Sequence, residues 1–291
     1  MKRVKEAVGR YERIFANRLL FIATLHQKDR VIAPLMKKEL SIVSQVAAID
    51  TNQFGTFSGT VPRKKSPLES ARLKCLEVKK TFPTADLVLA SEGSFGPHPF
   101  IPFVAGNEEL ILLKDFTNSH EWVVKELSTD TNFAAEAIES IEKGINFASK
   151  IGFPEHGLTI KKTAESVEVL HQEITDWEEL NTVLNRMFAE YNHLWMETDM
   201  RAHRNPTRMG VIKNAAIKLI RQLQSTCPSC DFPGFKVVDA IRGLPCQLCN
   251  QPTSAPLAHL YKCEYCAHES QMMHPNNKTH QDPMYCDFCN P

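Results

Sequence analysis

Cys227-Pro-Ser-Cys230 begins a series of four C-x-x-C motifs that decides the fold of the last 65 residues. The series continues with Cys246-Gln-Leu-Cys249, Cys263-Glu-Tyr-Cys266 and Cys286-Asp-Phe-Cys289, and gaps of 15, 13 and 19 residues separate the four motifs. Two thiolates three residues apart can hold one face of a tetrahedral metal ion, and a second pair completes its four ligands. The spacing predicts two structural Zn²⁺ sites in a zinc-ribbon-type module, with the ligands Cys227, Cys230, Cys246, Cys249, Cys263, Cys266, Cys286 and Cys289.

The spacing leaves the pairing of the four motifs open. Sequential pairing gives two successive ribbons, nested pairing puts the two inner motifs inside an outer site, and interleaved pairing gives a cross-brace. The sequence favours the first two arrangements equally over the third. Residues 235–241 and 257–261 have the composition of strands between motifs. Disulfides are the alternative to metal, but regular C-x-x-C pairs without a visible secretory signal favour metal.

The charge of this module limits what it can contact. Residues 227–291 contain four basic and six acidic side chains, a balance of 4 − 6 = −2, and eight thiolates around two Zn²⁺ ions add −8 + 4 = −4. A surface this negative repels phosphate backbones, so nucleic acid is not an expected partner. A structural role or a contact with another protein fits the charge better.

The rest of the chain has the composition of a folded protein. Of 291 residues, 43% are hydrophobic, and 34 basic residues balance 34 acidic ones, which excludes a mostly disordered chain and a basic nucleic-acid binder. The apolar run at residues 19–23 is far shorter than a membrane span, so no membrane association is expected. With no signal-peptide pattern, the expected location is the cytoplasm. The sequence does not indicate an oligomeric state.

Strand and helix patterns alternate before the cysteine motifs. Strands are predicted at residues 19–24, 41–49, 57–61, 86–91, 109–114, 121–126 and 158–162, and helices at 3–16, 30–40, 66–81, 133–151, 176–197 and 207–224. This order predicts the α/β class, with a mixed or mainly parallel sheet and flanking helices. We therefore divide the chain into an α/β domain at 1–225 and the zinc-ribbon module at 226–291.

The first candidate functional segment is Ser91-Glu92-Gly93-Ser94-Phe95-Gly96-Pro97-His98-Pro99, which follows an apolar strand. Ligands of α/β sheets bind at the carboxyl ends of strands, so we expect a functional loop here. Glu92 and His98 are candidates for acid/base chemistry or metal binding, and Ser94 for ligand binding. The alternative is a glycine- and proline-rich turn with incidental polar residues.

Two further segments have a similar position. His26 and Lys28 follow the first strand and precede a helix, where the free N–H groups favour an anion. His26 is a third catalytic candidate and Lys28 a ligand-binding one, against a solvated loop as the alternative. Asp50 follows the second strand and could supply a carboxylate to a cation, although taken alone it lies in an ordinary turn.

The third segment, residues 199–208, gathers positive charge at the start of a helix, with Asn205 as the N-cap residue. Arg201, His203 and Arg208 could form a cradle for a carboxylate or phosphate group. The equal alternative is an internal network of salt bridges with neighbouring carboxylates.

Several of these phrases resemble an uncharacterised bacterial family described only as a domain of unknown function, often with a zinc-ribbon-like tail. They are Ala90 to Pro99, Arg201-Ala-His-x-Asn-Pro-Thr-Arg-Met209 and Asp50-Thr-x-x-Phe-Gly-Thr-Phe57. The resemblance covers nearly the whole chain and implies a bacterial, cytoplasmic protein, but no activity.

A shorter stretch, residues 66–94, is similar to part of the inosine/xanthosine triphosphatase family. The matching positions are Glu69, Ala71, Pro83, Ala85, Asp86, Glu92 and Gly93. The similarity implies that Lys28 grips phosphate and that Glu92 helps to hold Mg²⁺ for attack by water. Ser94 stands where that family has glycine, and the family lacks the cysteine tail.

Two hypotheses of function follow. In the first, the three segments converge on one pocket that binds an anionic small molecule, with metal-dependent hydrolysis of a nucleotide or phosphoester as its enzymatic form. In the second, the protein is non-catalytic, and the zinc-ribbon module serves partner recognition or structure. The sequence contains no P-loop, G-x-S-x-G or G-x-G-x-x-G motif that would decide between them.

Overall fold

The computed structural model describes residues 12–54 and 65–291, which form two compact units. One unit comprises residues 17–219, and the other combines residues 1–16 with residues 220–291. The predicted fold class is confirmed, because a mixed sheet with flanking helices is accompanied by two four-cysteine groups. The predicted strand at 57–61 and most of the predicted helix at 3–16 lie outside the described residues, and α1 covers Glu12–Phe15.

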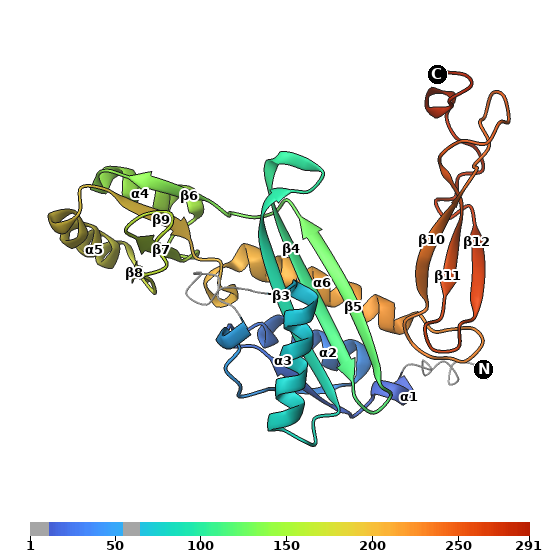
Figure 1. The fold of residues 1–291 in the computed structure, drawn as a ribbon, viewed down its shortest axis with the longest axis horizontal. Coiled ribbons are helices and arrows are strands. Elements are labelled where there is room, and N and C mark those ends of the chain that lie inside the picture. Colours follow the sequence, from blue (N-terminus) through green and yellow to red (C-terminus); the bar gives the residue numbers. More distant parts are fainter. Residues whose placement is uncertain (1–11, 55–64) are drawn as a thin grey trace, which may run out of the picture. The chain divides into compact units, whose positions relative to one another are not determined.

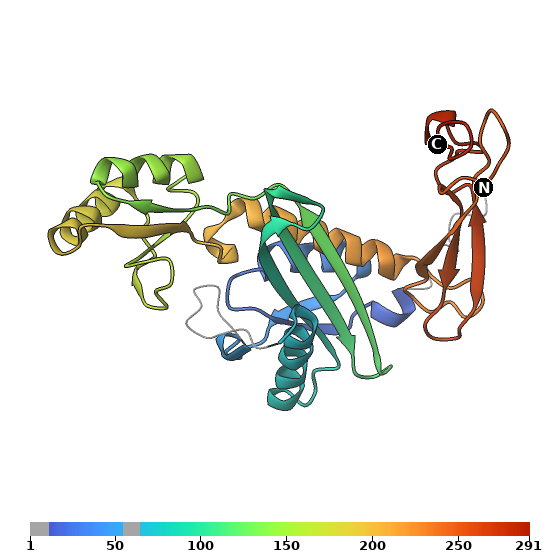
Figure 2. The ribbon, with the colours of Figure 1, turned by 45° about the horizontal axis from the view of Figure 1, so that its top comes forward.

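The larger unit contains a five-stranded mixed sheet in the order β2-β1-β3-β4-β5. Its strands are β1 (Leu19–Ala23), β2 (Val43–Val46), β3 (Leu87–His98), β4 (Ile101–Asp115) and β5 (His120–Ser128). The pairs β2/β1 and β1/β3 are parallel, whereas β3/β4 and β4/β5 are antiparallel. Helix α3 (Pro67–Thr81) covers one face, and α2 (Asp29–Leu40) and α6 (Pro206–Gln224) lie on the other (Figures 1 and 2).

Helix α3 begins where the sequence predicts it. The Ser66 hydroxyl accepts a hydrogen bond from the backbone N–H of Glu69, and the Glu69 carboxylate accepts one from the backbone N–H of Ser66. This reciprocal capping box satisfies two N–H groups that the helix itself leaves free. Ala71, Cys75 and Val78 recur at helical spacing and pack on β3 and β4, so that this stripe forms one of the cores.

The predicted loop at residues 91–99 is wrong. Strand β3 continues through His98, in register with β4 from Leu87 opposite Asp115 to Pro97 opposite Ala105. Glycine and proline suggested a turn, but the pairing of residues 91–98 with β4, three to twenty residues further along the chain, satisfies the backbone groups of this segment. Glu92 and Ser94 therefore lie on a long hairpin rather than in a loop.

The same unit contains a second, antiparallel sheet in the order β6-β9-β7-β8, which the sequence did not indicate as a separate layer. Its elements are β6 (Ala135–Ile138), α4 (Ile141–Ile151), β7 (Leu158–Lys161), β8 (Val169–His171), α5 (Trp177–Glu190) and β9 (Leu194–Thr198). The helices predicted at 133–151 and 176–197 are each wrong at one end. Those ends, β6 and β9, pair with one another across the chain, and this long-range pairing overrides local helix preference.

The cysteine motifs flank a three-stranded antiparallel sheet. It consists of β10 (Lys236–Arg242), β11 (Pro256–Lys262) and β12 (Glu269–Met273), of which the sequence predicted the first two. Short 3-10 helices are η1 (Asn52–Phe54), η2 (Ala202–Arg204) and η3 (Pro283–Tyr285). Among the described residues, no helix combines the length and the apolar character that crossing a membrane requires.

Candidate functional site

The eight cysteines of the four motifs form two groups that could each hold a metal ion. The Sγ atoms of each group all lie within 4.8 Å of one another. Cys227 and Cys266 are 3.7 Å apart in one group, and Cys249 and Cys286 are 3.6 Å apart in the other. A tetrahedral ion with Zn–S bonds of about 2.3 Å separates its sulfur ligands by about 3.8 Å, so both groups have suitable geometry.

The pairing is interleaved, which the sequence analysis favoured least. The first group combines Cys227, Cys230, Cys263 and Cys266, and the second combines Cys246, Cys249, Cys286 and Cys289. The sheet explains this result, because Lys236 at the start of β10 lies opposite Lys262 at the end of β11. The first and third motifs therefore meet at one end of the hairpin. Strand β12 returns the chain to the other end, where the fourth motif meets the second.

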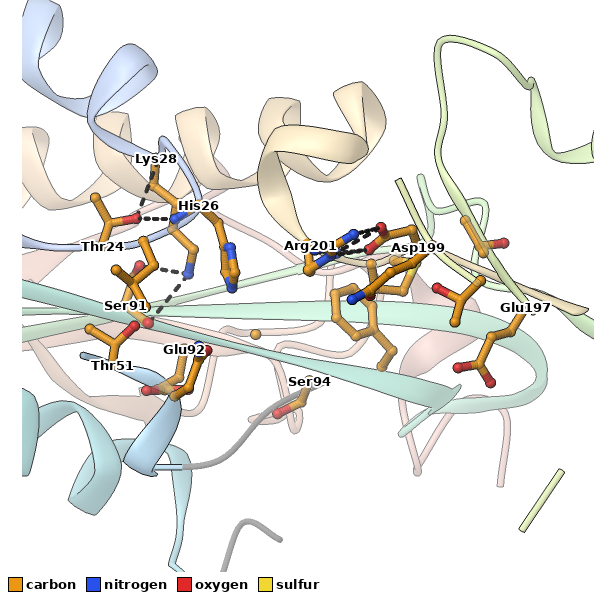
Figure 3. Close-up of a pocket in the computed structure, with 18 of the residues that line it drawn as sticks. Thr24, His26, Lys28, Thr51, Ser91, Glu92, Ser94, Glu197, Asp199 and Arg201 are labelled. Atoms are coloured by element: carbon orange, nitrogen blue, oxygen red, sulfur yellow. Dashed lines mark hydrogen bonds and ion pairs between the residues drawn. The ribbon is translucent and has the colours of Figure 1, made fainter. Parts of the chain in front are cut away.

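A cavity of about 910 Å³ opens at the carboxyl end of β1 and beside the middle of β3, within the unit of residues 17–219. Its wall includes parts of all three segments proposed from the sequence (Figure 3). The lining residues include Thr24, His26, Lys28, Thr51, Lys74, Ser91, Glu92, Ser94, Phe95, Phe133, Lys161, Glu197, Asp199 and Arg201. The second sheet contributes Lys161 and Glu197, so both sheets of the unit form this wall.

Lys28 is a buried cation on the cavity wall. The Thr24 hydroxyl accepts hydrogen bonds from the backbone N–H groups of His26 and Lys28, and thereby fixes the turn before α2. The Lys28 Nζ atom lies 2.9 Å from Ser91 Oγ and 3.3 Å from the Ser91 carbonyl oxygen. Burial, followed by the positive charge of Arg208, lowers the pKa of Lys28 to about 7. Within residues 12–54 and 65–291, no carboxylate forms an ion pair with Lys28.

The other cations of the wall have carboxylate partners. Lys74 Nζ lies 2.6 Å from Glu92 Oε1, and Lys161 Nζ lies 2.7 Å from Glu197 Oε1. The Arg201 guanidinium contacts both carboxylate oxygens of Asp199 and also pairs with Glu173. These pairs neutralise their members, so Lys28 differs from its neighbours in having no carboxylate partner in the part of the chain that the structure describes.

Arg208 and Glu109 form a fully buried ion pair beside the cavity. Arg208 Nε donates to Glu109 Oε1 at 2.7 Å, and a second guanidinium nitrogen donates to the Met200 carbonyl oxygen. A Cβ atom on Gly93 would lie 2.6 Å from Glu109 Oε1, so a larger residue at this position would force the ion pair to shift. The guanidinium also lies over the Phe95 ring, 5.1 Å from its centroid.

Two histidine rings stack at the cavity. The centroids of His26 and His203 are 5.2 Å apart and the ring planes differ by 19°. Burial, assisted by the charge of Lys28, lowers the pKa of His26 to about 3. Burial also lowers the pKa of His203, with Arg201 as the second cause. Both imidazoles are therefore neutral at pH 7 and add no positive charge to the site.

The structure brings most of the predicted site residues together, and their roles stay predictions. The wall contains Glu92, His26, Lys28, Ser94 and Arg201. His203 stacks on His26, and Arg208 is occupied by Glu109, which agrees with an internal salt-bridge network at residues 199–208.

The remaining two predicted site residues are not part of this wall. Asp50 accepts a hydrogen bond from the backbone N–H of Asn52 and so stabilises a local turn. His98 lies near the end of the β3–β4 hairpin, where its Nδ1 atom accepts from the backbone N–H of Phe100. The structure therefore separates these two side chains from the cavity.

Sequence reasoning missed Lys74, Lys161 and the phenylalanines of the wall, and it considered Glu197 only as a partner of the basic residues at 199–208, whereas Glu197 pairs with Lys161. Lys74 had a visible signal, because it shares the stripe of α3 that Ala71, Cys75 and Val78 bury. A lysine on a buried helix face requires an anion or a cavity. Lys161 and Glu197 gave no such signal, since their pairing depends on the second sheet.

These observations define a mixed α/β protein with two interleaved four-cysteine groups and a polar cavity beside β1, β3 and the second sheet. The chain belongs to the family described as "Domain of unknown function (DUF6671)", whose model matches residues 74–291. No curated protein matches the chain. The matched range includes the β3 part of the cavity and all eight cysteines of the module, while Lys28 and His26 precede it. The family description assigns no activity, so the geometry of the site has to suggest one.

Proposed function

We propose that the cavity binds a small molecule through an anionic group, phosphate or carboxylate, that contacts Lys28. The observation that carries this proposal is the position of Lys28, a buried amine on the cavity wall without a carboxylate partner among the described residues. Burying a charged group without a counter-ion costs several kcal/mol, and an anion in the cavity would remove that cost.

The surroundings of Lys28 favour an anion over a cation. The amine also lies near Arg208 and Lys74, whose charges act on it together with those of Glu109 and Glu92. Those four groups form two ion pairs, Lys74 with Glu92 and Arg208 with Glu109. The positive charge that these pairs leave over on this part of the cavity wall is therefore that of Lys28. An anion that contacts Lys28 and the hydroxyl of Ser91 would be held by a charge-assisted hydrogen bond.

The rest of the ligand should carry a planar ring. The Phe95 and Phe133 rings stack with centroids 5.9 Å apart, and both line the cavity. Ser91 and Phe95 lie on the same face of β3, four residues and therefore about 13 Å apart. A nucleotide, which joins an anionic end to a planar base, fits this division of the wall.

We propose binding of the ligand and no catalytic activity. Apart from the two cysteine groups, the described residues hold no set of three histidine, cysteine or carboxylate ligands close enough to share a metal ion. The arrangement of Glu92 also differs from that of a metal ligand, because its carboxylate pairs with Lys74. Hydrolysis by a Mg²⁺ ion that arrives with a nucleotide is tested as a separate outcome.

We further propose that both cysteine groups bind Zn²⁺ and that the ions have a structural role. The support is the spacing of the sulfur atoms and the presence of four thiol ligands in each group, which leaves no open coordination position. Thiols that remain available for metal suit a reducing compartment, so we place the protein in the cytoplasm.

The test is calorimetric titration of the full chain with inorganic phosphate, pyrophosphate and adenosine mono- and triphosphate. We expect at least one probe to bind, and Lys28→Met to weaken it at least tenfold. Lys37→Met, at an exposed lysine of α2, the helix that directly follows Lys28, is the matched control and should change nothing. Equal affinity of the wild type and Lys28→Met for every probe would contradict the proposal.

A second comparison tests the ring. Phe133→Leu should weaken a nucleoside monophosphate about tenfold and leave ribose 5-phosphate unchanged, because only the first ligand has a base to stack. Phe103→Leu removes an exposed ring outside the cavity wall and serves as the control. Release of inorganic phosphate from a bound triphosphate in the presence of Mg²⁺ would extend the proposal to hydrolysis.

A further inference from the structure

The second cysteine group is surrounded by exposed apolar side chains. Leu248 is 72% exposed and Phe288 is 69% exposed, and Met284 and Tyr285 are each 58% exposed. Large apolar side chains scattered singly over a surface are ordinary, but a contiguous group marks an interaction site.

The turns that carry these four side chains lie close together because of the metal-site geometry. Leu248 is the third residue of Cys246-Gln-Leu-Cys249, and Phe288 is the third residue of Cys286-Asp-Phe-Cys289. All four Sγ atoms of this group lie within 4.8 Å of one another, so the two turns that carry Leu248 and Phe288 are neighbours. Met284 and Tyr285 form the short helix η3 directly before Cys286. We call these four residues the apolar tip.

The first cysteine group provides an internal comparison. Its equivalent third residues are Ser229 and Tyr265. The Tyr265 ring stacks on Phe232 at 4.4 Å and 11°, so this aromatic residue already has a partner within the module. No ring contact of Phe288 or Tyr285 occurs among the described residues. The two groups share a ligand pattern but differ in whether their apolar neighbours are covered.

The charge around the tip is negative. Asp282 and Asp287 are the charged residues between Thr279 and Pro291, and residues 244–252 contain none. Four thiolates around a divalent ion carry −4 + 2 = −2, and Lys278 lines a hollow with Leu244 and Gln281, so this end of the module has a formal charge of −2 − 2 + 1 = −3. An apolar surface with this charge complements a partner that surrounds its own apolar side chains with lysine or arginine.

We propose that the apolar tip is a docking surface for a basic amphipathic segment of another protein. Leu248 and Phe288 provide the central apolar contacts, because they are the most exposed members and lie on the two turns that hold the metal. Asp282 and Asp287 contact the flanking basic side chains. The metal ion fixes the two turns and therefore presets the surface before binding.

The experiment uses the full, metal-loaded chain and three synthetic 18-residue peptides. The first has leucine at helical spacing with lysine elsewhere, the second replaces each lysine with glutamate, and the third is a scramble of the first. Fluorescence anisotropy of labelled peptide measures affinity. We expect binding in the order lysine peptide, scramble, glutamate peptide, and at least a tenfold loss for Leu248→Ser/Phe288→Ser.

The control variant is Phe100→Ser/Phe103→Ser, which removes two side chains that are 83% and 90% exposed on the other unit. It should bind the lysine peptide as the wild type does. Metal analysis of both double variants should give two ions per chain, which separates loss of the surface from loss of the fold. Equal peptide binding by Leu248→Ser/Phe288→Ser and the wild type would overturn the proposal.

Two other outcomes would also overturn it. If light scattering shows a wild-type dimer that Leu248→Ser/Phe288→Ser converts to a monomer, the occupant of the tip is a second copy of the chain. If a single-stranded oligonucleotide competes for the same residues, the partner is a nucleic acid. The titrations of the cavity use other ligands and variants, so their failure would leave these results unaffected.

Discussion

The cysteine module and the cavity both collect side chains that are far apart in the sequence, but by different means. In the module, a three-stranded sheet places turns at its two ends, and each turn presents two sulfur atoms. In the cavity, Lys28 reaches Ser91 across 63 residues and Arg208 reaches Glu109 across 99. The module thus repeats one local unit, whereas the cavity depends on unique long-range contacts.

The difference shows what a residue type can reveal. Four successive C-x-x-C motifs favour metal binding over the redox role that a single motif can have, so the ligands could be named from the sequence. A lysine or glutamate is ordinary on any surface. Its meaning in the cavity depends on whether a partner neutralises it, and only the folded structure separates Lys28 from the paired Lys74 and Lys161.

The largest expected effect tests the module. Cys227→Ser should lower the metal content from two ions to one per chain and make residues 226–291 sensitive to protease. Structural zinc contributes about 10–16 kcal/mol in small zinc-binding peptides, far more than the module can replace. Elemental analysis measures the loss. Cys75→Ala is the control, because Cys75 is buried in α3, where burial raises its pKa to about 12, and it should retain both ions.

The next effect concerns the long-range contacts of the larger unit. Arg208→Met should destabilise the protein by about 3–5 kcal/mol, because it leaves the Glu109 charge buried without a partner. Arg72→Ala, which breaks a more exposed pair with Glu121, should cost less than about 1 kcal/mol. Denaturant unfolding measures both. Equal losses of stability in the two variants would mean that the buried pair contributes no more than an exposed one. The larger unit would then not depend on this long-range contact as the comparison with the module assumes.

A smaller effect, of opposite sign, is expected at Lys28. The folded-state pKa of about 7 lies below the ordinary value of 10.5, so the unfolded chain holds the extra proton between these values. Wild-type stability should therefore rise with pH from about 7 to 10. Lys28→Met should be more stable than the wild type by about 1–3 kcal/mol at pH 6, and the advantage should shrink as pH rises. Thermal unfolding across pH 6–9 measures it, and a destabilised variant at pH 6 would contradict the assigned burial.

The smallest effect is at the start of α3. Ser66→Ala removes the hydroxyl that caps the helix and should cost about 1 kcal/mol, without changing metal content. Ser66→Asp keeps an acceptor and should restore most of the loss. A loss of stability above about 3 kcal/mol would indicate that the cap also positions Lys74 in the cavity. The local capping interaction would then contribute to the cavity, which otherwise depends on long-range contacts.

Local signals explain which parts of the fold the sequence could predict. The capping box of α3, the Asn205 cap of α6 and the strands β1, β10 and β11 follow from patterns a few residues long. The errors occur where a distant partner decides. Residues 91–98 form a strand because β4 pairs with them, and residues 194–198 form one because β6 and β7 do.

The residues of the candidate site also separate into those that local signals predict and those whose position depends on distant contacts. Strand ends and a helix start indicated His26, Lys28, Glu92 and Arg201, which all line the cavity. His98 and Asp50 had the same residue types in similar positions, yet the hairpin and a local turn hold them outside its wall. Composition indicates candidate residues, but the pairing of β3 with β4 decides which side chains of residues 91–98 face the cavity.

The interleaved pairing of the cysteines also determines the order in which the two metal groups become complete during translation. The first metal group is complete once Cys266 has emerged from the ribosome, whereas the second waits for Cys289, which is 23 residues later. At about 5–20 residues per second, this delay is about 1–5 s. During that interval Cys246 and Cys249 are nascent thiols without their second pair, open to oxidation or to the wrong metal. A chain truncated between residues 270 and 285 and stalled by a C-terminal linker long enough to carry Cys266 out of the ribosome exit tunnel should therefore carry one ion, already in its final place.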